Sequence, residues 1–516
     1  MVWAVPEHAL TRRTLLAGTL GGVGALGVSG VAPAWARRAV GLSASLASTP
    51  RVVTLDVGRV SEVPVTVRLP GRFDLAGVQW QGPADAHVQL RGALDFGAWG
   101  RFADASAHGH GPDSPPAQGE SVGDPVWLGG TDRLQLRCTS PVTGVRLHLI
   151  DVSSGRGARA LAAQSGPWAG KAIATAARAA GAGQPAIVAR HAWAQGVGLP
   201  RERPAYGVVH LGFVHHTENP NGYSFAEVPA MLRAIFLYHR DAKGWSDIGY
   251  NFVVDRFGRI FEARAGGVDE PVVGAHTGGY NLFSTGVAVL GEFSDVNVSA
   301  PARRALTRLL AWKLSLHGQP VSGTVNVRVD PSGAQFSRYP ARAHVRLPRI
   351  AGHRDADSTD CPGNVLYGQL PGLRQATRAR TAAATRVVVA AAPTHPPAAG
   401  AVTVSGVLRR LTGAPLGGAA VVIEGRRDPG RGRAAHELTL TTVTTGADGR
   451  FSAPLIIGGV AVLRALYRGG EGLASVSEPL ALRAPRAPAA APSPAPAPPA
   501  PPPPPSPPPA PGAPAG

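Results

Sequence analysis

Three separated stretches of this 516-residue sequence carry side chains that could together bind a metal ion. His215 ends an alternating apolar run, His353 opens a polar loop, and Cys361 closes that loop eight residues later. Two imidazoles and a thiolate suit zinc at neutral pH, and three protein ligands leave a fourth position for water. The loop has little to bury, because Ala356 is its one apolar residue, so a metal would help to hold it. These residues predict a catalytic zinc site in a hydrolase.

The first 36 residues have the order of a bacterial export signal. Arg12-Arg13 is followed by a glycine-rich, weakly apolar stretch, and Ala34-Trp35-Ala36 has the small-x-small pattern of a cleavage site. The apolar stretch is short, so it would span a membrane poorly; an uncleaved anchor is the alternative. We expect residues 1–36 to be a twin-arginine signal peptide. The mature protein is then secreted or held at the cell wall, with no integral membrane segment.

The formal net charge of +18 favours an anionic partner such as nucleic acid, an acidic cell-wall polymer or a membrane surface. Export from the cytoplasm argues against nucleic acid and leaves anionic cell-wall polymers as candidates. The charge alone does not decide, because GC-rich coding would also explain the excess of arginine in a sequence rich in Ala, Gly and Pro.

The chain has only two cysteines, so a disulfide competes with the proposed zinc site. Exported proteins often pair their cysteines. Cys138, however, ends the alternating run 134–138, where a small buried side chain is the expected role. A disulfide between Cys138 and Cys361 would remove the zinc thiolate, and it stays open as the alternative.

Composition and hydrophobic periodicity divide the mature chain into domains. Residues 45–154 alternate as short strands between Gly, Pro and Asp clusters, which predicts an all-β sandwich. Residues 155–184 form an Ala/Gly-rich linker. After a second linker at 384–398, strand patterns within 399–484 predict an immunoglobulin-like or regulatory-like β domain. The Pro-rich residues 485–516 are expected to be disordered and extended.

The central block, residues 185–383, mixes strand and helix periods and must position the candidate ligands. Residues 208–214 alternate as a strand that leads into His215. A capping-box spacing from Ser224 to Glu227 opens a helix that runs to about His239. Further elements are a strand–turn–strand unit, a strand and a helix, at 250–263, 287–293 and 299–318. The pattern predicts an α/β domain with a mixed sheet and flanking helices.

This block resembles the peptidoglycan recognition protein and type-2 N-acetylmuramoyl-L-alanine amidase family. Four motifs in order carry the resemblance: VARHAW at 188–193, GWSDIGYNF at 244–252, GAHTGGYN at 274–281 and GHRDADSTDCPG at 352–363. The preceding β module, with FDLAGVQW at 73–80 and PVWLGG at 125–130, looks like the module found before the amidase domain in secreted actinobacterial members. The resemblance implies a zinc amidase domain that acts on peptidoglycan.

The resemblance also implies a role for each residue of the metal site. The family's zinc ligands fall on His215, His353 and Cys361. Members in which the ligand cysteine is replaced are generally binding proteins without amidase activity, so the presence of Cys361 favours catalysis. The neighbouring His216 is not a ligand by this resemblance, and packing or a contact behind the ligands is its expected role.

Two further positions match catalytic residues of the family. Its catalytic tyrosine falls on Tyr250 and its polar residue before the cysteine falls on Thr359. A related branch uses a glutamate on a strand where this chain has Ala288, so proton handling shifts to Tyr250. Since a phenol is a poor general base, Tyr250 would position water or donate a hydrogen bond to the oxyanion, and Thr359 would donate to the same oxyanion.

Other polar residues of the motifs are candidates for binding or support. His276 and Asn281 are expected to line the peptide groove, although a tight-turn role explains Asn281 as well. Asp355 or Asp357 could orient a ligand imidazole, with loop solvation as the alternative for both.

The implied reaction is zinc-assisted hydrolysis of the amide between N-acetylmuramic acid and L-alanine. Two alternatives stay open. One is a non-catalytic peptidoglycan-binding or structural wall protein, and the other is a zinc carboxypeptidase that cuts another bond of the wall peptide. The products distinguish them, because the amidase frees L-alanine amino termini, the carboxypeptidase frees D-alanine, and the binding protein frees nothing.

Overall fold

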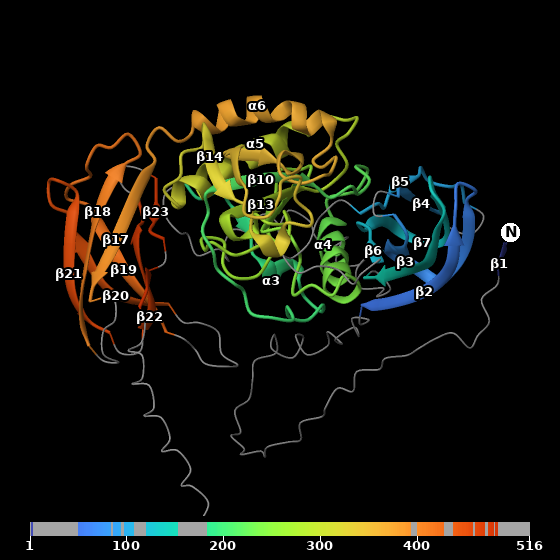
Figure 1. Cartoon of the computed structure of the whole chain (residues 1–516), viewed down its shortest axis with the longest axis horizontal. Coiled ribbons are helices and arrows are strands. Elements are labelled where there is room, and N and C mark those ends of the chain that lie inside the picture. Colours follow the sequence, from blue (N-terminus) through green and yellow to red (C-terminus); the bar gives the residue numbers. More distant parts are fainter. Residues whose placement is uncertain are drawn as a thin grey trace, which may run out of the picture.

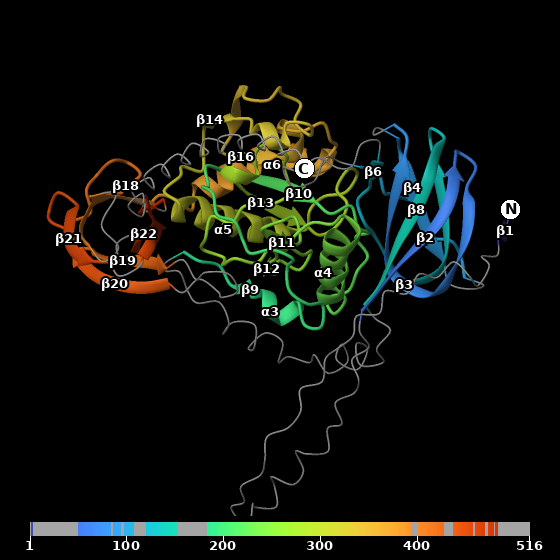
Figure 2. The ribbon, with the colours of Figure 1, turned by 60° about the horizontal axis from the view of Figure 1, so that its bottom comes forward.

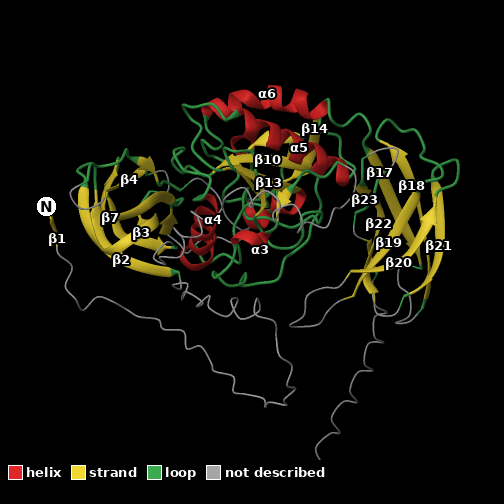
Figure 3. Ribbon diagram, turned by 180° about the vertical axis from the view of Figure 1, so that it is seen from behind, coloured by secondary structure: helices red, strands yellow, loops and turns green. Residues whose placement is uncertain are grey.

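The computed structural model of the chain describes residues 2–3, 50–83, 86–93, 97–107, 120–152, 183–393, 400–427, 437–457, 460–469, 473–478 and 480–482. Almost all of the predicted signal peptide and first linker, and the whole Pro-rich tail, lie outside these residues. The described helices lie in a central domain, with a domain of strands on either side of it (Figures 1 and 3). None of them is long and apolar enough to cross a membrane. The predicted fold class, an α/β domain between two β modules, is confirmed.

The N-terminal domain is a β-sandwich, as its alternating sequence predicts. Its strands pair in the order β2-β8-β3-β7-β4-β5, and β1 and β6 also pair with β3. Cys138 ends β7 and is buried in the apolar core of this domain, which is the predicted role of this cysteine. The strands are β1 (Val2–Trp3), β2 (Arg51–Val60), β3 (Val65–Gln81), β4 (Val88–Ala93), β5 (Ala103–Asp104), β6 (Glu120–Val122), β7 (Val126–Cys138) and β8 (Val142–Asp151).

The central domain is built on a mixed sheet with the order β16-β10-β13-β11-β12-β9. Strand β10 lies parallel to both β13 and β16, while β11 and β12 form the antiparallel strand–turn–strand unit expected from the sequence. The strands are β9 (Ile187–Val188), β10 (Leu211–His216), β11 (Phe252–Val254), β12 (Ile260–Glu262), β13 (Ser284–Val289) and β16 (Ile350–Gly352), with β14 (Thr324–Arg328) and β15 (His344–Pro348) as a separate hairpin.

Helices cover both faces of this sheet, and side chains on successive residues of a strand point to opposite faces. Val214 and Val287 belong to the apolar cluster that includes residues of α5 and α6, whereas Ala288 packs with residues of α4. His215 is paired with Ala288 across the parallel strands, so its imidazole lies on the α4 side. The helices are α3 (Arg190–Trp193), α4 (Val228–Leu237), α5 (Ala300–Leu316) and α6 (Asn364–Arg378), with single turns η3 (Tyr238–Ala242), η4 (Asn281–Phe283), η5 (Pro331–Gly333) and η6 (His353–Asp355).

Helix α4 begins at Val228 and not at Ser224, so the predicted start is four residues early. Pro229 explains the difference, because proline is favoured in a first helical turn. Half of the expected capping box forms before the helix, where the Ser224 N–H donates to Glu227 Oε2 at 2.7 Å. The predicted start of α5 is confirmed, since Ser299 Oγ caps it by accepting from the Ala302 N–H.

The N-terminal domain is packed closely against α4 and the turn that follows it (Figure 2). Tyr238 donates its hydroxyl to the Gly123 carbonyl at 2.8 Å, and a Cβ on Gly77 would lie 2.1 Å from the Tyr238 ring. Lys243 Nζ forms a buried ion pair with Asp124 Oδ1 at 2.7 Å. These contacts join two domains that the sequence separates into independent modules.

The C-terminal domain has two antiparallel sheets, β17-β18-β21 and β20-β19-β22-β23, with β24 paired to β22. Strand β17 (Thr385–Ala392) occupies most of the segment predicted as a linker, 384–398, so that prediction is wrong there. Its Val/Ala sequence looks like a linker, yet its side chains alternate between buried and exposed. The other strands are β18 (Ala401–Arg410), β19 (Ala420–Arg427), β20 (Glu437–Thr444), β21 (Arg450–Ile456), β22 (Val460–Tyr467), β23 (Ser475–Val476) and β24 (Leu480–Ala481).

A buried ion-pair network ties this domain to the central one. Arg464 forms ion pairs with Glu270 of the central domain and with Glu424 of its own domain, the second at 2.8 Å. Arg426 also reaches Glu270, at 2.9 Å. Because Leu466 and Val476 join the apolar cluster around α5, the contact is apolar as well as ionic.

A buried histidine of the N-terminal domain predicts loss of stability in acid. His148 accepts from Thr54 and contacts Gln79 Oε1 at 2.9 Å; burial, assisted by Arg146, lowers its pKa to about 4. Between the unfolded value of about 6.5 and pH 4 only the unfolded chain takes up this proton. Stability from His148 is therefore complete above about pH 6.5 and falls by up to about 3 kcal/mol toward pH 4.

The check is a set of calorimetric melting curves at pH 7, 5 and 4 for wild type and His148→Gln. The glutamine cannot gain a proton, so the variant should lose less Tm on acidification than wild type does. Equal acid sensitivity of the two proteins would show that His148 is not the group responsible.

Candidate metal centre

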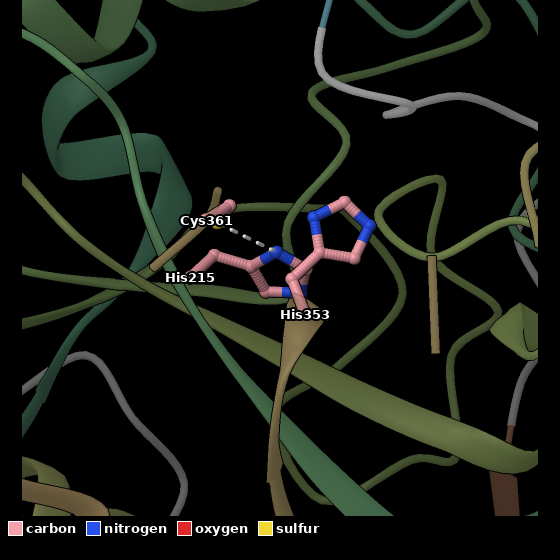
Figure 4. Close-up of side chains that lie close together, drawn as sticks. All are labelled: His215, His353 and Cys361. Carbon is pink, nitrogen blue, oxygen red and sulfur yellow. Dashed lines mark hydrogen bonds between the residues drawn. The ribbon is translucent and has the colours of Figure 1, made fainter. Parts of the chain in front are cut away.

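The side chains of His215, His353 and Cys361 lie close together (Figure 4). They lie on the α4 side of the sheet, the side to which His215 points. One possible ligand atom from each residue lies within 4.8 Å of the others, and all three side chains are fully buried. Sγ of Cys361 is 3.7 Å from Nδ1 of His215, and the two imidazole centroids are 4.6 Å apart. Two imidazoles and one thiol at these separations fit a zinc ion with three protein ligands.

Parallel strand pairing brings the two histidines together from positions 138 residues apart in the sequence. Val214 on β10 is paired with Gly352 on β16, so the residues that follow, His215 and His353, leave the sheet side by side. The loop from His353 to Cys361 is closed by a hydrogen bond from the Arg354 N–H to the Cys361 carbonyl at 3.0 Å.

A required glycine then turns the chain away from the site. Gly363 has φ +88°, and a Cβ there would lie 2.4 Å from the carbonyl carbon of Phe293. Only glycine fits both this backbone conformation and this close approach. In the Cys-Pro-Gly motif, the glycine is thus required by the backbone conformation, and the cysteine is the candidate metal ligand.

Buried polar groups behind the ligands hold both imidazoles. His353 Nε2 is 3.0 Å from Asp357 Oδ2, which leaves Nδ1 as the metal-binding nitrogen. His215 Nε2 is 3.1 Å from His276 Nδ1, so its Nδ1 is the nitrogen that faces Cys361. Of the two aspartates considered from the sequence, the structure therefore selects Asp357; Asp355 instead accepts from the Gly352 N–H and the Tyr367 hydroxyl.

Asp357→Asn is expected to weaken zinc binding by about 10- to 100-fold, because the amide no longer holds the His353 ring through a charged acceptor. Zinc affinity is measured by competition with a chromogenic chelator. Asp355→Asn is the matched control, since it is the same change in the same loop without contact to a ligand ring. Equal affinities of the two variants would contradict this role for Asp357.

Cys361 is a buried free thiol, and Cys138 is also free, so the alternative of a disulfide between them is wrong. The His216 N–H donates to Cys361 Sγ at 3.4 Å. Burial raises the pKa of this thiol well above its ordinary value of 9.0. A thiol in such surroundings becomes a thiolate when a metal ion binds it, because the ion's charge favours the deprotonated form. The donor set therefore fits zinc.

Tyr250 and Thr359 lie beside this cluster. The Tyr250 ring centroid is 5.5 Å from that of His215, and its hydroxyl donates a long hydrogen bond of 3.4 Å to the His216 carbonyl. Burial raises the pKa of Tyr250 well above 10.0, which favours the protonated hydroxyl that donates this hydrogen bond. Thr359 is half-buried, and its Oγ1 accepts from the Cys361 N–H at 3.1 Å.

His276 and Asn281 are both buried under the site. Asn281 Oδ1 accepts from the backbone N–H groups of His276 and Thr277, at 2.8 and 3.1 Å, which is the turn role that the sequence left open. His276 in turn supports the His215 ring. Their buried positions favour support of the metal centre over contact with a peptide.

Two acidic residues near the site were not singled out from the sequence. Glu218 lies 3.0 Å from His216 Nε2 and has a positive φ of 56°, which is uncommon for a residue with a side chain. Asp124 comes from the N-terminal domain, and both negative charges help to raise the pKa of Cys361. Nothing in the local sequence marks Asp124, because it approaches the site only through the packing of two domains.

Comparison with known proteins agrees with this geometry. Residues 203–364 match the family model described as N-acetylmuramoyl-L-alanine amidase. The central domain belongs to this amidase family. Residues 36–179 match a second model, described as Rv3811 N-terminal galactose-binding domain-like. The resemblance stated from the sequence motifs is confirmed for both domains.

Individual relatives match about a third of the chain. The human N-acetylmuramoyl-L-alanine amidase is 34% identical over 194 residues, which are 36% of this chain and 28% of the human protein. Peptidoglycan-recognition protein SC2 of Drosophila simulans is 29% identical over 157 residues, 30% of this chain and 70% of that protein. A solved structure of wild-type Drosophila PGRP-LB has 24% identity and a TM-score of 0.27, and the alignment covers 36% of this chain and 91% of that one.

Proposed function

We propose that this protein is an exported zinc amidase that hydrolyses the amide bond between N-acetylmuramic acid and L-alanine in peptidoglycan. The single observation that carries the proposal is the buried cluster of His215, His353 and Cys361 in a domain of the amidase family. The cysteine matters most, because the third ligand is what distinguishes a catalytic zinc set from two histidines that only pack.

His215, His353 and Cys361 would hold the ion. A zinc ion bound there would polarise the scissile carbonyl and would lower the pKa of a bound water molecule to about 7. Asp357 and His276 keep the two imidazoles oriented, so the ligand nitrogens are in place before substrate arrives.

Hydrogen-bond donors of the chain would stabilise the charge that develops on the substrate oxygen. Tyr250 stays protonated and can turn its hydroxyl from the long contact with the His216 carbonyl to the substrate. Thr359 accepts from a backbone N–H, which leaves its own hydroxyl proton to donate outward. Donors fixed in a site with little water are effective because they need not reorganise during the reaction.

Export is part of the same proposal. The Arg12-Arg13 motif and the Ala34-Trp35-Ala36 sequence support a twin-arginine signal, and peptidoglycan lies outside the cytoplasmic membrane. A fusion of residues 1–40 to a reporter that folds before export tests the signal. Replacement of Arg12-Arg13 by Lys-Lys should hold the reporter in the cytoplasm, and unchanged export would contradict the twin-arginine assignment.

The activity is tested with purified peptidoglycan and the full mature chain. We expect zinc-loaded protein to release stem peptides with free L-alanine amino termini, identified by mass spectrometry after N-terminal labelling. Protein treated with a chelator should release none until zinc is restored. Release of D-alanine would indicate a carboxypeptidase, and co-sedimentation with the wall without any product would indicate a binding protein.

Tyr250→Phe separates the donor role from metal binding. The ring remains, so zinc affinity should be unchanged while kcat falls by about 10²- to 10³-fold, the usual cost of one lost oxyanion donor. Zinc content by atomic absorption and initial rates on a soluble muropeptide are the two measurements. A variant that loses zinc and activity together would show that Tyr250 supports the site and does not serve the reaction.

A further inference from the structure

The outer surface of α5 and α6 carries a groove that is separate from the metal centre. The groove has a volume of about 720 Å³ and is lined by Arg303, Arg304 and Thr307 of α5, by Gly368 and Gly372 of α6, and by Arg380 just beyond it, among others. We call it the α5–α6 groove. Both helices lie on one face of the central sheet (Figure 1), which is the face opposite to His215. The groove is therefore on the other side of the domain from the zinc ligands.

The charge around this groove is positive and uncompensated. Neither α5 nor α6 contains an aspartate or glutamate. Five exposed arginines lie on or beside the two helices, and none of them has an ion-pair partner among the described residues: Arg303, Arg304, Arg308, Arg378 and Arg380. Some arginines elsewhere in the domain do have such partners, for example Arg190 with Asp247 and Arg259 with Asp255.

Two glycines in α6 are not required by packing among the residues that the structure describes. Gly368 and Gly372 stand inside the helix, where glycine is less favourable than alanine. A Cβ added to either would meet no atom within 4 Å, so packing does not require them. Their effect is to leave the helix backbone bare along the floor of the groove, where a bound chain could approach closely.

We propose that the α5–α6 groove binds an anionic wall polymer linked by phosphodiester groups. Guanidinium groups recognise phosphate oxygens through paired hydrogen bonds and are always charged. The residues from Gly368 to Arg378 extend over about 15 Å of helix at 1.5 Å per residue, which is more than one phosphate group occupies and matches a repeating anion. The proposal goes beyond the amidase activity, and its choice of a wall polymer rests on the proposed export.

Such binding would hold the protein on the wall while the metal centre, on the opposite face of the domain, hydrolyses peptidoglycan. The groove also accounts for part of the net charge of +18, because it shows where several of the arginines gather. The sequence alone does not show this. Because the contact is electrostatic and exposed, it should weaken steeply as salt is added.

The test measures binding of the full mature chain to poly(glycerol phosphate) by calorimetry, beside polygalacturonate of similar length and neutral dextran. The groove variant is Arg303→Ser, Arg304→Ser and Arg380→Ser together. The matched control is Arg72→Ser, Arg328→Ser and Arg346→Ser, three exposed arginines on other surfaces, so both proteins have the same net charge. We expect the groove variant to lose at least about tenfold in affinity and the control less than about twofold.

Equal losses in the two variants would show that only net charge matters and would overturn the proposal. Equal or tighter binding of polygalacturonate would overturn the choice of a phosphodiester ligand. The amidase assay is a separate measurement, so a failure here leaves the proposed activity standing and a failure there leaves the groove standing.

A second variant separates loss of binding from loss of folding. Gly368→Ala with Gly372→Ala should raise the Tm by about 2–4 °C, because alanine favours the helix. The same change fills the floor of the groove, so affinity for poly(glycerol phosphate) should fall severalfold. A protein that is more stable and binds as well as wild type would contradict a ligand seated on these glycines.

Discussion

Cys361→Ser is expected to abolish zinc binding and to lower peptidoglycan hydrolysis by at least about a hundredfold. The substitution keeps the size of the side chain and replaces a thiol by a hydroxyl, which is a far weaker ligand for zinc. The two histidines would remain, supported by Asp357 and His276, but a site with two ligands cannot fix the ion. Zinc content and the rate of stem-peptide release are the measurements.

Cys138→Ser is the matched control for this prediction. Cys138 is the other cysteine of the chain, and it is equally buried and free. Its serine variant should be less stable, since a hydroxyl enters an apolar core, but should keep both zinc and activity. If Cys361→Ser retained its zinc, or if the Cys138 variant lost it, the assignment of the third ligand would be wrong.

Asp124→Ala is expected to destabilise the protein by about 3 kcal/mol, because it leaves the ammonium of Lys243 buried without its partner. The pair lies at the contact between the N-terminal and central domains, so the loss should appear in the unfolding of both. Guanidinium unfolding, followed by tryptophan fluorescence and by zinc release, measures the effect.

The double variant Asp124→Leu, Lys243→Met tests the reason for this loss. With both charges replaced by apolar groups no unpaired charge remains, so the double variant should be more stable than Asp124→Ala. If it were as unstable as the single variant, the packing of this contact, and not its charge, would be what holds the domains together.

Several elements of the central domain were predictable from the sequence, because their signals are local. The alternation that leads into His215 and the serine that caps α5 are short-range signals, and both are found in the structure. The choice between Asp355 and Asp357 was not predictable. Both lie in one polar loop, and only the fold shows which carboxylate meets the His353 ring.

The errors also have physical causes. The segment 384–398 looks like a linker because valine and alanine carry little pattern, yet tertiary pairing with β18 makes most of it a strand. The contact of Asp124 with Lys243 depends on two surfaces, each of which looks ordinary within its own domain. Contacts between domains produce no hydrophobic periodicity in the sequence, so they cannot be predicted from a single sequence.

The packing of the Tyr238 ring against Gly77 limits which N-terminal domains could replace the present one. An N-terminal module acquired from another protein would have to present a bare backbone where Gly77 stands and a carbonyl where Gly123 stands. It would also need an acidic residue to meet Lys243. Exchange of either domain alone would therefore leave a mismatched surface at this contact.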